Sequence, residues 1–216
     1  MSDIIDISYF NKVTDWQKVK ASVDAVVIRL GYRGYSKGTL AYDKSYAAFR
    51  KAVEQFNIPH SFYFFPCSIN EAEAIQEADF IIQALAGADL ALPVFLDSEI
   101  AEVKNKFGRS DKLSRATRTH LLAVICERLQ AAGIPAGVYA STSWLNNQLD
   151  MTQLPYTVWV AQYNTKCTYK GSYLLWQYSS KGQIPGISGN VDCSRLVNVQ
   201  DVVFPLPGYE VGKTYR

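Results

Sequence analysis

Two carboxylates stand two residues apart at the end of an apolar run. Residues 92–96 have the composition of a buried strand, and Asp97 and Glu99 follow on either side of Ser98. Because successive side chains of a strand point to opposite faces, Asp97 and Glu99 are expected to share one face. Like charges this close raise the pKa of one carboxyl group. A protonated carboxyl beside an ionised partner is what general acid catalysis on a glycosidic bond requires.

The Asp-x-Glu spacing also has an ordinary structural explanation. Such tripeptides are frequent by chance, and most are solvated loop edges that follow a strand. The elements around the two acids therefore decide whether they form a site.

Strands and helices are predicted to alternate along most of the chain. Short β-branched or aromatic runs indicate the strands, and apolar residues at helical spacing indicate the helices. The predicted strands cover residues 4–8, 24–30, 60–65, 92–99, 134–140, 158–163, 173–178 and 190–192. The predicted helices begin near residue 14 and cover 43–56, 70–85, 110–132 and a short segment from 141.

Three helix ends carry capping signals. Thr14 is the expected N-cap of the first helix, with Gln17 three residues on. Asn70 with Glu73 repeats this spacing, and Gly133 is a natural residue just beyond a helix C-terminus.

This alternation predicts a parallel α/β sheet with right-handed crossovers. Eight strands within about 195 residues favour an irregular single-domain (β/α) barrel, with fewer helices in its C-terminal third. An open doubly wound sheet is the alternative, but no G-x-G-x-x-G follows the first strand.

Four acids end or nearly end predicted strands. They are Asp6, Asp97, Glu99 and Asp192. In a barrel the C-terminal ends of the strands form the active-site mouth, so these acids are expected to meet in one acidic cleft. Polar residues also occur where strands end for purely structural reasons. That explanation is sufficient for any one of these acids, but it accounts less well for all four together.

The composition is that of an ordinary globular protein. Of 216 residues 48% are hydrophobic and 19% charged, and the net charge is +2 with scattered basic residues, so nucleic-acid binding is not expected. The first residues lack a Sec signal, which predicts synthesis in the cytoplasm. No apolar run reaches transmembrane length, so membrane insertion is not expected.

The cysteines show no metal-binding spacing. Cys67, Cys126, Cys167 and Cys193 are far apart in sequence, and the chain has only two histidines. We therefore predict neither a metal site nor a cofactor. Whether Cys167 and Cys193 pair stays open at this stage.

Several short segments occur in a characteristic order along the chain. They are Asp6-Ile7-Ser8 with Asp15-Trp16, Tyr63-Phe64-Phe65, residues 93–99, Gly137-Val138-Tyr139-Ala140-Ser141 with Trp144, Trp159-Val160-Ala161-Gln162-Tyr163, Leu175-Trp176-Gln177-Tyr178 and Val191-Asp192. In this order they resemble family 25 of the glycoside hydrolases, the N-acetylmuramidases (Chalaropsis-type lysozymes) of phage endolysins and bacterial autolysins. The resemblance runs from residue 3 to about residue 198.

The resemblance implies a β/α barrel that hydrolyses the β-1,4 bond between N-acetylmuramic acid and N-acetylglucosamine in bacterial peptidoglycan. It assigns Glu99 as the general acid and Asp97 as the carboxylate that assists the substrate acetamido group. The substrate-binding residues that it implies are Asp6, Asp192, Tyr63, Phe65, Tyr139, Trp176 and Gln177.

Two positions depart from the family pattern. Ser98 stands where an apolar residue is more common, and Phe64 stands where His is frequent. We expect little effect of Ser98 on the chemistry, because its side chain should face away from the two acids.

Two rival functions remain open. One is a chitinase-like glycosidase, although the longer Asp-x-x-Asp-x-Asp-x-Glu pattern of such enzymes is missing. The other is a catalytically weak glycan-binding barrel, which would not need all four acids.

The last residues change in character. We expect residues 1–200 to form the catalytic barrel, and residues 201–216 to be a Pro-rich linker followed by the start of a truncated wall-binding module. A wall-binding partner module would then belong to the full-length protein, which would act on the bacterial cell wall.

Overall fold

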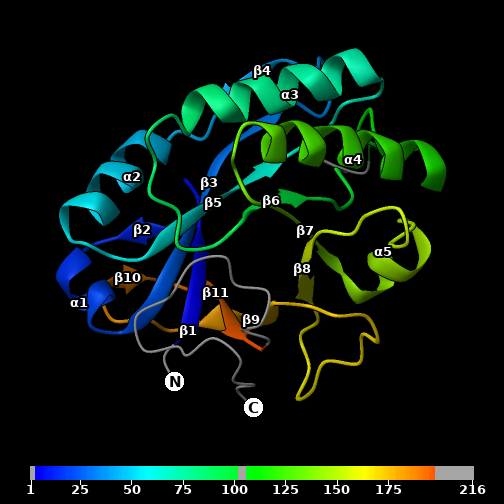
Figure 1. Cartoon of the computed structure of the whole chain (residues 1–216). Helices are drawn as coiled ribbons and strands as arrows, with labels where there is room; N and C mark the ends of the chain where they lie inside the picture. The colour runs from blue at the N-terminus through cyan, green and yellow to red at the C-terminus, as the bar shows by residue number, and fades with distance from the viewer. Residues whose placement is uncertain (1–2, 102–105, 198–216) are drawn as a thin grey trace.

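The computed structural model describes residues 3–101 and 106–197, and most of its strands form a closed barrel (Figure 1). The sheet order is β1-β11-β9-β8-β7-β6-β5-β3-β4, and an additional pairing of β1 with β3 closes the ring of eight strands. The barrel strands are β1 (Asp3–Ile7), β3 (Val23–Arg33), β5 (His60–Phe65), β6 (Val94–Asp97), β7 (Ala136–Ser141), β8 (Thr157–Ala161), β9 (Leu175–Gly182) and β11 (Val191–Leu196).

Three short strands lie outside the ring. β4 (Leu40–Tyr42) pairs with the end of β3, and β2 (Lys12–Val13) pairs with β10 (Ile187–Ser188) in a separate ribbon. The predicted eight-stranded α/β barrel is therefore confirmed.

Five helices cover the barrel in the described part of the chain. They are α1 (Trp16–Lys20), α2 (Tyr46–Gln55), α3 (Glu71–Ala84), α4 (Arg115–Ala131) and α5 (Thr142–Asn147). Helices α3 and α4 lie side by side over β5 and β6 (Figure 1). No described residue beyond Asn147 is helical, which agrees with the prediction of a helix-poor C-terminal third.

Alternation along each strand separates two hydrophobic layers. Residues such as Ala25, Phe95 and Trp159 fill the barrel interior, whereas their sequence neighbours Val26 and Leu96 face the helices. Each strand therefore presents every second side chain to the axis, and those nearest the mouth form the site.

The capping predictions are confirmed at two of the three helix ends. Asn70 accepts a hydrogen bond from the Glu73 amide, and Gly133 has the positive φ of 78° expected beyond a helix end. The predicted N-cap of the first helix is wrong, because Asp15 and not Thr14 accepts hydrogen bonds from the amides of the first turn. Asp is as good an N-cap as Thr, and the Thr14 hydroxyl donates instead to the Gly186 carbonyl.

The last strand runs in the direction opposite to the prediction. Asp192 was expected to close a strand, but it is the second residue of β11, which is antiparallel to both β1 and β9. The short apolar stretch before Asp192 does not reveal direction, which depends on the neighbouring strands. Because β11 is antiparallel to its neighbours, its N-terminal end lies at the mouth of the barrel. Asp192, near that end, therefore lies with the other three acids as predicted, although the strand runs in the opposite direction.

All four cysteines are free, with Cys67, Cys126 and Cys193 buried and Cys167 partly exposed. None of the described helices is both long and apolar enough to cross a membrane. The predicted linker and module start at residues 201–216 lie outside the described residues.

Candidate active site

The four predicted acids line one cavity at the mouth of the barrel. Its volume is about 180 Å³, and its lining residues are Asp6, Tyr63, Asp97, Glu99, Tyr139, Trp159, Tyr163, Gln177 and Asp192. Seven different strands or strand ends contribute to it, as expected where all strands of a barrel converge.

Asp6 and Asp192 face each other across neighbouring strands. They are directly opposite in the antiparallel register of β1 and β11. Like charges in this position repel, so the pKa of Asp6 is raised well above its ordinary value, first by burial and then by the charge of Asp192. The pKa of Asp192 is also raised, because burial removes part of its hydration.

Gln177 connects Asp6 to two tyrosines. Its Nε2 donates to Asp6 Oδ2 at 2.8 Å, and its Oε1 accepts from the hydroxyls of Tyr139 and Tyr163, each at 2.9 Å. This network joins β1, β7, β9 and the segment after β8. It fixes the orientation of the amide, and the hydrogen bond to Asp6 partly opposes the rise in its pKa.

Asp97 and Glu99 have different surroundings although they are two residues apart. The Asp97 side chain is buried, whereas Glu99 reaches solvent at the rim of the cavity. Burial, followed by the charges of Glu99 and Asp6, raises the pKa of Asp97 well above its ordinary value. Partial desolvation and the charge of Asp192 raise the pKa of Glu99.

Asp97 also has an unused acceptor. Its buried Oδ1 makes no hydrogen bond to any described residue. A buried carboxylate oxygen without a donor is costly, and a ligand N–H group entering the cavity would satisfy it.

A cation that acts on Asp97 already has a carboxylate partner. The charge of Arg29 on β3 lowers the pKa of Asp97, but less than burial and the neighbouring acids raise it. Arg29 Nε donates to Asp43 Oδ2 at 2.8 Å, so much of its charge is balanced elsewhere. The cavity therefore favours protonated carboxyl groups.

The structure places most, but not all, of the predicted binding residues in the cavity. Tyr63, Tyr139 and Gln177 line it, but Phe65 and Trp176 do not. Phe65 lies at the last position of β5, beyond Tyr63. Trp176 packs in the outer layer and donates to the Gln162 carbonyl, because it neighbours Gln177 on β9 and must face the opposite side.

Two lining residues were missed as site candidates. Trp159 lies in the middle of β8 and Tyr163 two residues beyond its end, and both line the cavity. Every second residue from Trp159 faces the barrel axis, and this alternation continues past the end of the strand to Tyr163. The same rule applied to the sequence would have identified both residues.

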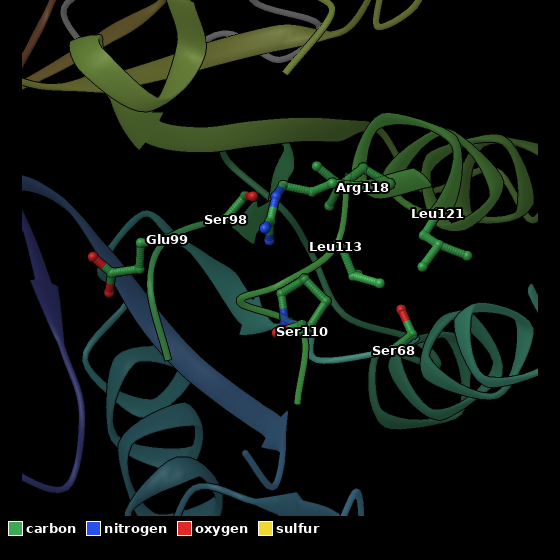
Figure 2. A pocket seen from close by; sticks show the side chains of 9 residues that line it. Ser68, Ser98, Glu99, Ser110, Leu113, Arg118 and Leu121 are labelled. Atoms are coloured by element: carbon green, nitrogen blue, oxygen red, sulfur yellow. The ribbon is translucent and has the colours of Figure 1, made fainter. Parts of the chain in front are cut away.

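Ser98 lies on the other side of the strand end, where it contributes to a second, small cavity of about 20 Å³. Figure 2 shows the Ser98 hydroxyl and Arg118 directed to this side, while the Glu99 carboxylate points away. Ser98 Oγ accepts from Trp144 Nε1 at 3.0 Å, and its amide donates to the Tyr139 carbonyl. These two bonds hold the peptide between the two acids.

The cavity offers proton donors and acceptors rather than a preformed ion site. Among the described residues, no group of three or more His, Cys, Asp or Glu is placed to hold a metal ion. Four carboxyls with raised pKa values around an aromatic floor suit general acid chemistry on an uncharged, hydroxyl-rich substrate.

Comparisons with known proteins agree with this chemistry. The model of the family "Glycosyl hydrolases family 25" matches residues 5–187. The chain is 26% identical over 195 residues to an autolytic lysozyme of Clostridium acetobutylicum, covering 89% of this chain and 55% of that protein.

Two solved structures give the same picture. The modular autolysin LytC of Streptococcus pneumoniae, in complex with a synthetic peptidoglycan ligand, has a TM-score of 0.79 and 29% identity, covering 89% of this chain and 46% of that one. The catalytic domain of endolysin ply40, from bacteriophage P40 of Listeria monocytogenes, shares the fold with a TM-score of 0.71 and 24% identity, covering 91% and 93%. The chain thus spans about half the length of the autolysins that it matches.

Proposed function

The chain belongs to glycosyl hydrolases family 25, and from this premise we propose that it is a muramidase, which cleaves the β-1,4 bond between N-acetylmuramic acid and N-acetylglucosamine in bacterial peptidoglycan. The observation that carries the proposal is the cavity itself. It holds a solvent-reaching Glu99 beside a buried Asp97 at the end of β6, with Asp6 and Asp192 opposite.

Glu99 is proposed as the general acid. Its raised pKa keeps a larger fraction protonated near neutral pH, and its position at the rim allows contact with the glycosidic oxygen. Raised pKa alone would fit Asp97 equally well. Asp97 is buried at the cavity floor, however, whereas Glu99 is exposed to an incoming substrate. This difference in exposure assigns the role of general acid to Glu99 in the proposal.

Asp97 is proposed to orient the substrate 2-acetamido group. Its unpartnered Oδ1 would accept the acetamido N–H, which would direct the acetamido carbonyl oxygen toward the anomeric carbon. Glu99 would give its proton to the leaving O4 oxygen as the bond from C1 to that oxygen breaks and the acetamido oxygen bonds to C1. Water would then attack C1, release the acetamido oxygen and return a proton to Glu99.

A second route uses an acid across the cleft to activate water directly. Asp6 and Asp192 are the acids in that position, and they are proposed in either case to bind the substrate with Tyr63, Tyr139 and Gln177. Retention of configuration at C1 would support the acetamido route, and inversion would support direct attack by water.

Identification of the new reducing ends tests the bond assignment. The chain is incubated with purified peptidoglycan and, separately, with chitin, and the products are reduced with borohydride and identified by mass spectrometry. We expect reduced N-acetylmuramic acid from peptidoglycan and little release from chitin. Reduced N-acetylglucosamine as the main peptidoglycan end would overturn the bond assignment. Efficient release from chitin would favour a chitinase-like enzyme, and binding without release a glycan-binding barrel.

A further inference from the structure

Two adjacent aromatic rings stand exposed directly after the strand that carries Asp6. Tyr9 is 42% and Phe10 73% exposed, and their ring centroids are 4.0 Å apart. At this separation and a tilt of 33° the two rings stack on each other, and Phe10 is the more exposed of the two. We call this pair the β1 platform.

The platform packs on an ion pair between the partly buried Arg29 and the buried Asp43. Arg29 lies beneath both rings, with its Cζ 5.2 Å from the Tyr9 centroid and 5.3 Å from that of Phe10. Asp43 is buried, forms a 2.7 Å contact with Arg29, and accepts the Tyr9 amide at 3.3 Å. Asp43 balances the charge of Arg29. Lys44, whose Nζ lies 5.5 Å from the Tyr9 centroid, adds an exposed positive charge beside the rings.

The turn that carries the rings is also closed on itself. The Ser8 amide donates to Asn11 Oδ1 at 2.9 Å, and the Asn11 amide donates to the Ser8 carbonyl at 2.9 Å. Asn11 Nδ2 further donates to the Asn190 carbonyl, two residues before Asp192. The rings are thus ordered before any ligand arrives, which lowers the entropic cost of binding.

The platform follows β1 at the end of the barrel that holds the cavity. It begins three residues after Asp6, and Arg29 is the register partner of Tyr63 in the parallel pair of β3 and β5. Asp6 and Tyr63 both line the cavity. A polymer that lies across the mouth of the barrel past Asp6 could therefore reach the platform.

We propose that the β1 platform stacks one saccharide ring of the glycan strand, beyond the two rings joined by the cleaved bond. One face of a pyranose ring presents C–H groups, which pack favourably on the electron-rich face of an aromatic ring. This inference rests on the proposed function, because it takes the glycan strand as the substrate. It adds a specificity that the acids alone do not give: preference for long glycan chains over short fragments.

A double variant, Tyr9→Ala with Phe10→Ala, tests the inference. Its steady-state kinetics are compared with those of the parent chain on long soluble glycan strands and on the shortest fragment that the parent cleaves. We expect KM for long strands to rise about tenfold, with kcat little changed and a much smaller rise in KM for the short fragment. An unchanged KM for long strands, or equal rises on both, would overturn the platform.

Two controls separate stacking from structural damage. The exchange Tyr9→Phe with Phe10→Tyr keeps two aromatic rings and should recover most of the lost affinity. Tyr173→Ala removes a partly buried aromatic at the opposite end of the barrel, beside the first residues of β8 and β9, and should leave KM for long strands unchanged.

A binding experiment tests the platform independently of catalysis. Glu99→Gln chains with and without the double Ala change are sedimented with insoluble peptidoglycan, and the bound fractions are compared. Weaker binding without the rings would support the platform even if the parent chain cleaves nothing, in which case the proposed activity alone fails. Cleavage by the parent with equal sedimentation of both variants would overturn the platform and leave the activity standing.

Discussion

At the scale of single residues, the cavity acids oppose one another's ionisation. Asp6 has a raised pKa mainly because it is buried and secondarily because it faces Asp192. The folded chain therefore binds this proton more tightly than the unfolded chain does. The stabilisation from Asp6 is greatest below the unfolded pKa of about 3.9 and is lost as the pH rises through the raised folded pKa.

Replacement of Asp6 by Asn should therefore raise the melting temperature at pH 7, and the gain should shrink toward pH 4. Asn keeps an acceptor for Gln177, so the hydrogen bond of 2.8 Å has a substitute. Thermal unfolding at the two pH values measures the effect. Asp150→Asn is the matched control with the opposite sign, because hydrogen bonds from Thr152 lower the pKa of Asp150. A lower melting temperature for Asp6→Asn at pH 7 would contradict this account of the acids.

Ser98 is a positioning residue in this account, since it holds the peptide between the two acids but faces away from them. Ser98→Ala leaves Trp144 Nε1 without its acceptor and should cost about 1 kcal/mol of unfolding free energy. The sequence alone predicts little effect of Ser98 on the chemistry, but the hydrogen bond from Trp144 changes that expectation. We expect kcat of Ser98→Ala to fall severalfold with KM nearly unchanged, whereas Ser98→Thr, which keeps the hydroxyl, should recover most of kcat.

A double-mutant cycle with Trp144→Phe checks whether this bond carries the effect. If the hydrogen bond is responsible, the two single losses should not add in the double variant. Fully additive losses would show that Ser98 acts through something other than Trp144.

Sequence reasoning found the acids but not the network around them. Alternation along one strand is enough to pair Asp97 with Glu99, because it is a local property. The contacts of Gln177 with Asp6, Tyr139 and Tyr163 join separate elements. A single sequence does not show at what level along the barrel axis each of these side chains lies. Trp176 is different, since alternation alone excludes Trp176 and Gln177 from sharing one face.

At the scale of elements, a buried ion pair ties β3 to α3. Arg33 Nε donates to Glu77 Oε1 at 2.8 Å, and the same oxygen accepts the Cys67 amide at 3.0 Å. Burial raises the pKa of Glu77 to about 7, despite the opposing charge of Arg33. The pair therefore positions the start of the loop between β5 and α3 at an electrostatic cost.

Glu77→Ala should lower the unfolding free energy by about 3 kcal/mol, at the lower end of the usual cost of breaking a buried pair. Arg33 keeps three other acceptors, the carbonyls of Gly38 and Glu73 and the side chain of Gln76, which limits the loss. Chemical denaturation measures it. Glu54→Ala breaks the more exposed pair with Arg50 and should cost roughly 0–1 kcal/mol. Equal losses in the two variants would contradict the importance of burial.

Strand direction is the feature of the elements that the sequence did not reveal. Helices between strands imply parallel neighbours, and this reasoning holds from β3 to β8. β9 is also parallel to β8, although no helix lies between them. β11 follows β9 through a short ribbon rather than a helix, so it can return antiparallel. A connection without a helix therefore leaves the direction of the next strand open, since β9 is parallel to β8 and β11 is antiparallel to β9.

At the scale of the whole molecule, Trp159 joins the barrel core to the floor of the cavity. It is buried, its ring contacts those of Tyr63, Phe95 and Tyr139, and its Nε1 donates to Ser194 Oγ at 3.0 Å across the interior. The barrel is therefore packed below the site, and the site is a shallow mouth rather than a channel.

Trp159→Ala should lower the unfolding free energy by about 3–5 kcal/mol, because it empties the centre of the barrel and leaves a buried hydroxyl unpaired. Phe107 is 62% exposed, so Phe107→Ala should change stability by less than about 0.5 kcal/mol. Urea unfolding of both variants provides the comparison. A small loss for Trp159→Ala would mean that the interior does not depend on this side chain.

The central claim is that Glu99 gives a proton to the glycosidic oxygen, and dye release from labelled peptidoglycan by Glu99→Gln tests it most directly. Gln has nearly the same shape but cannot act as an acid, and the exposed position should leave folding intact, as circular dichroism would verify. We expect the release rate to fall at least about a hundredfold from that of the parent chain. Near-normal release by a folded Glu99→Gln chain would contradict the account.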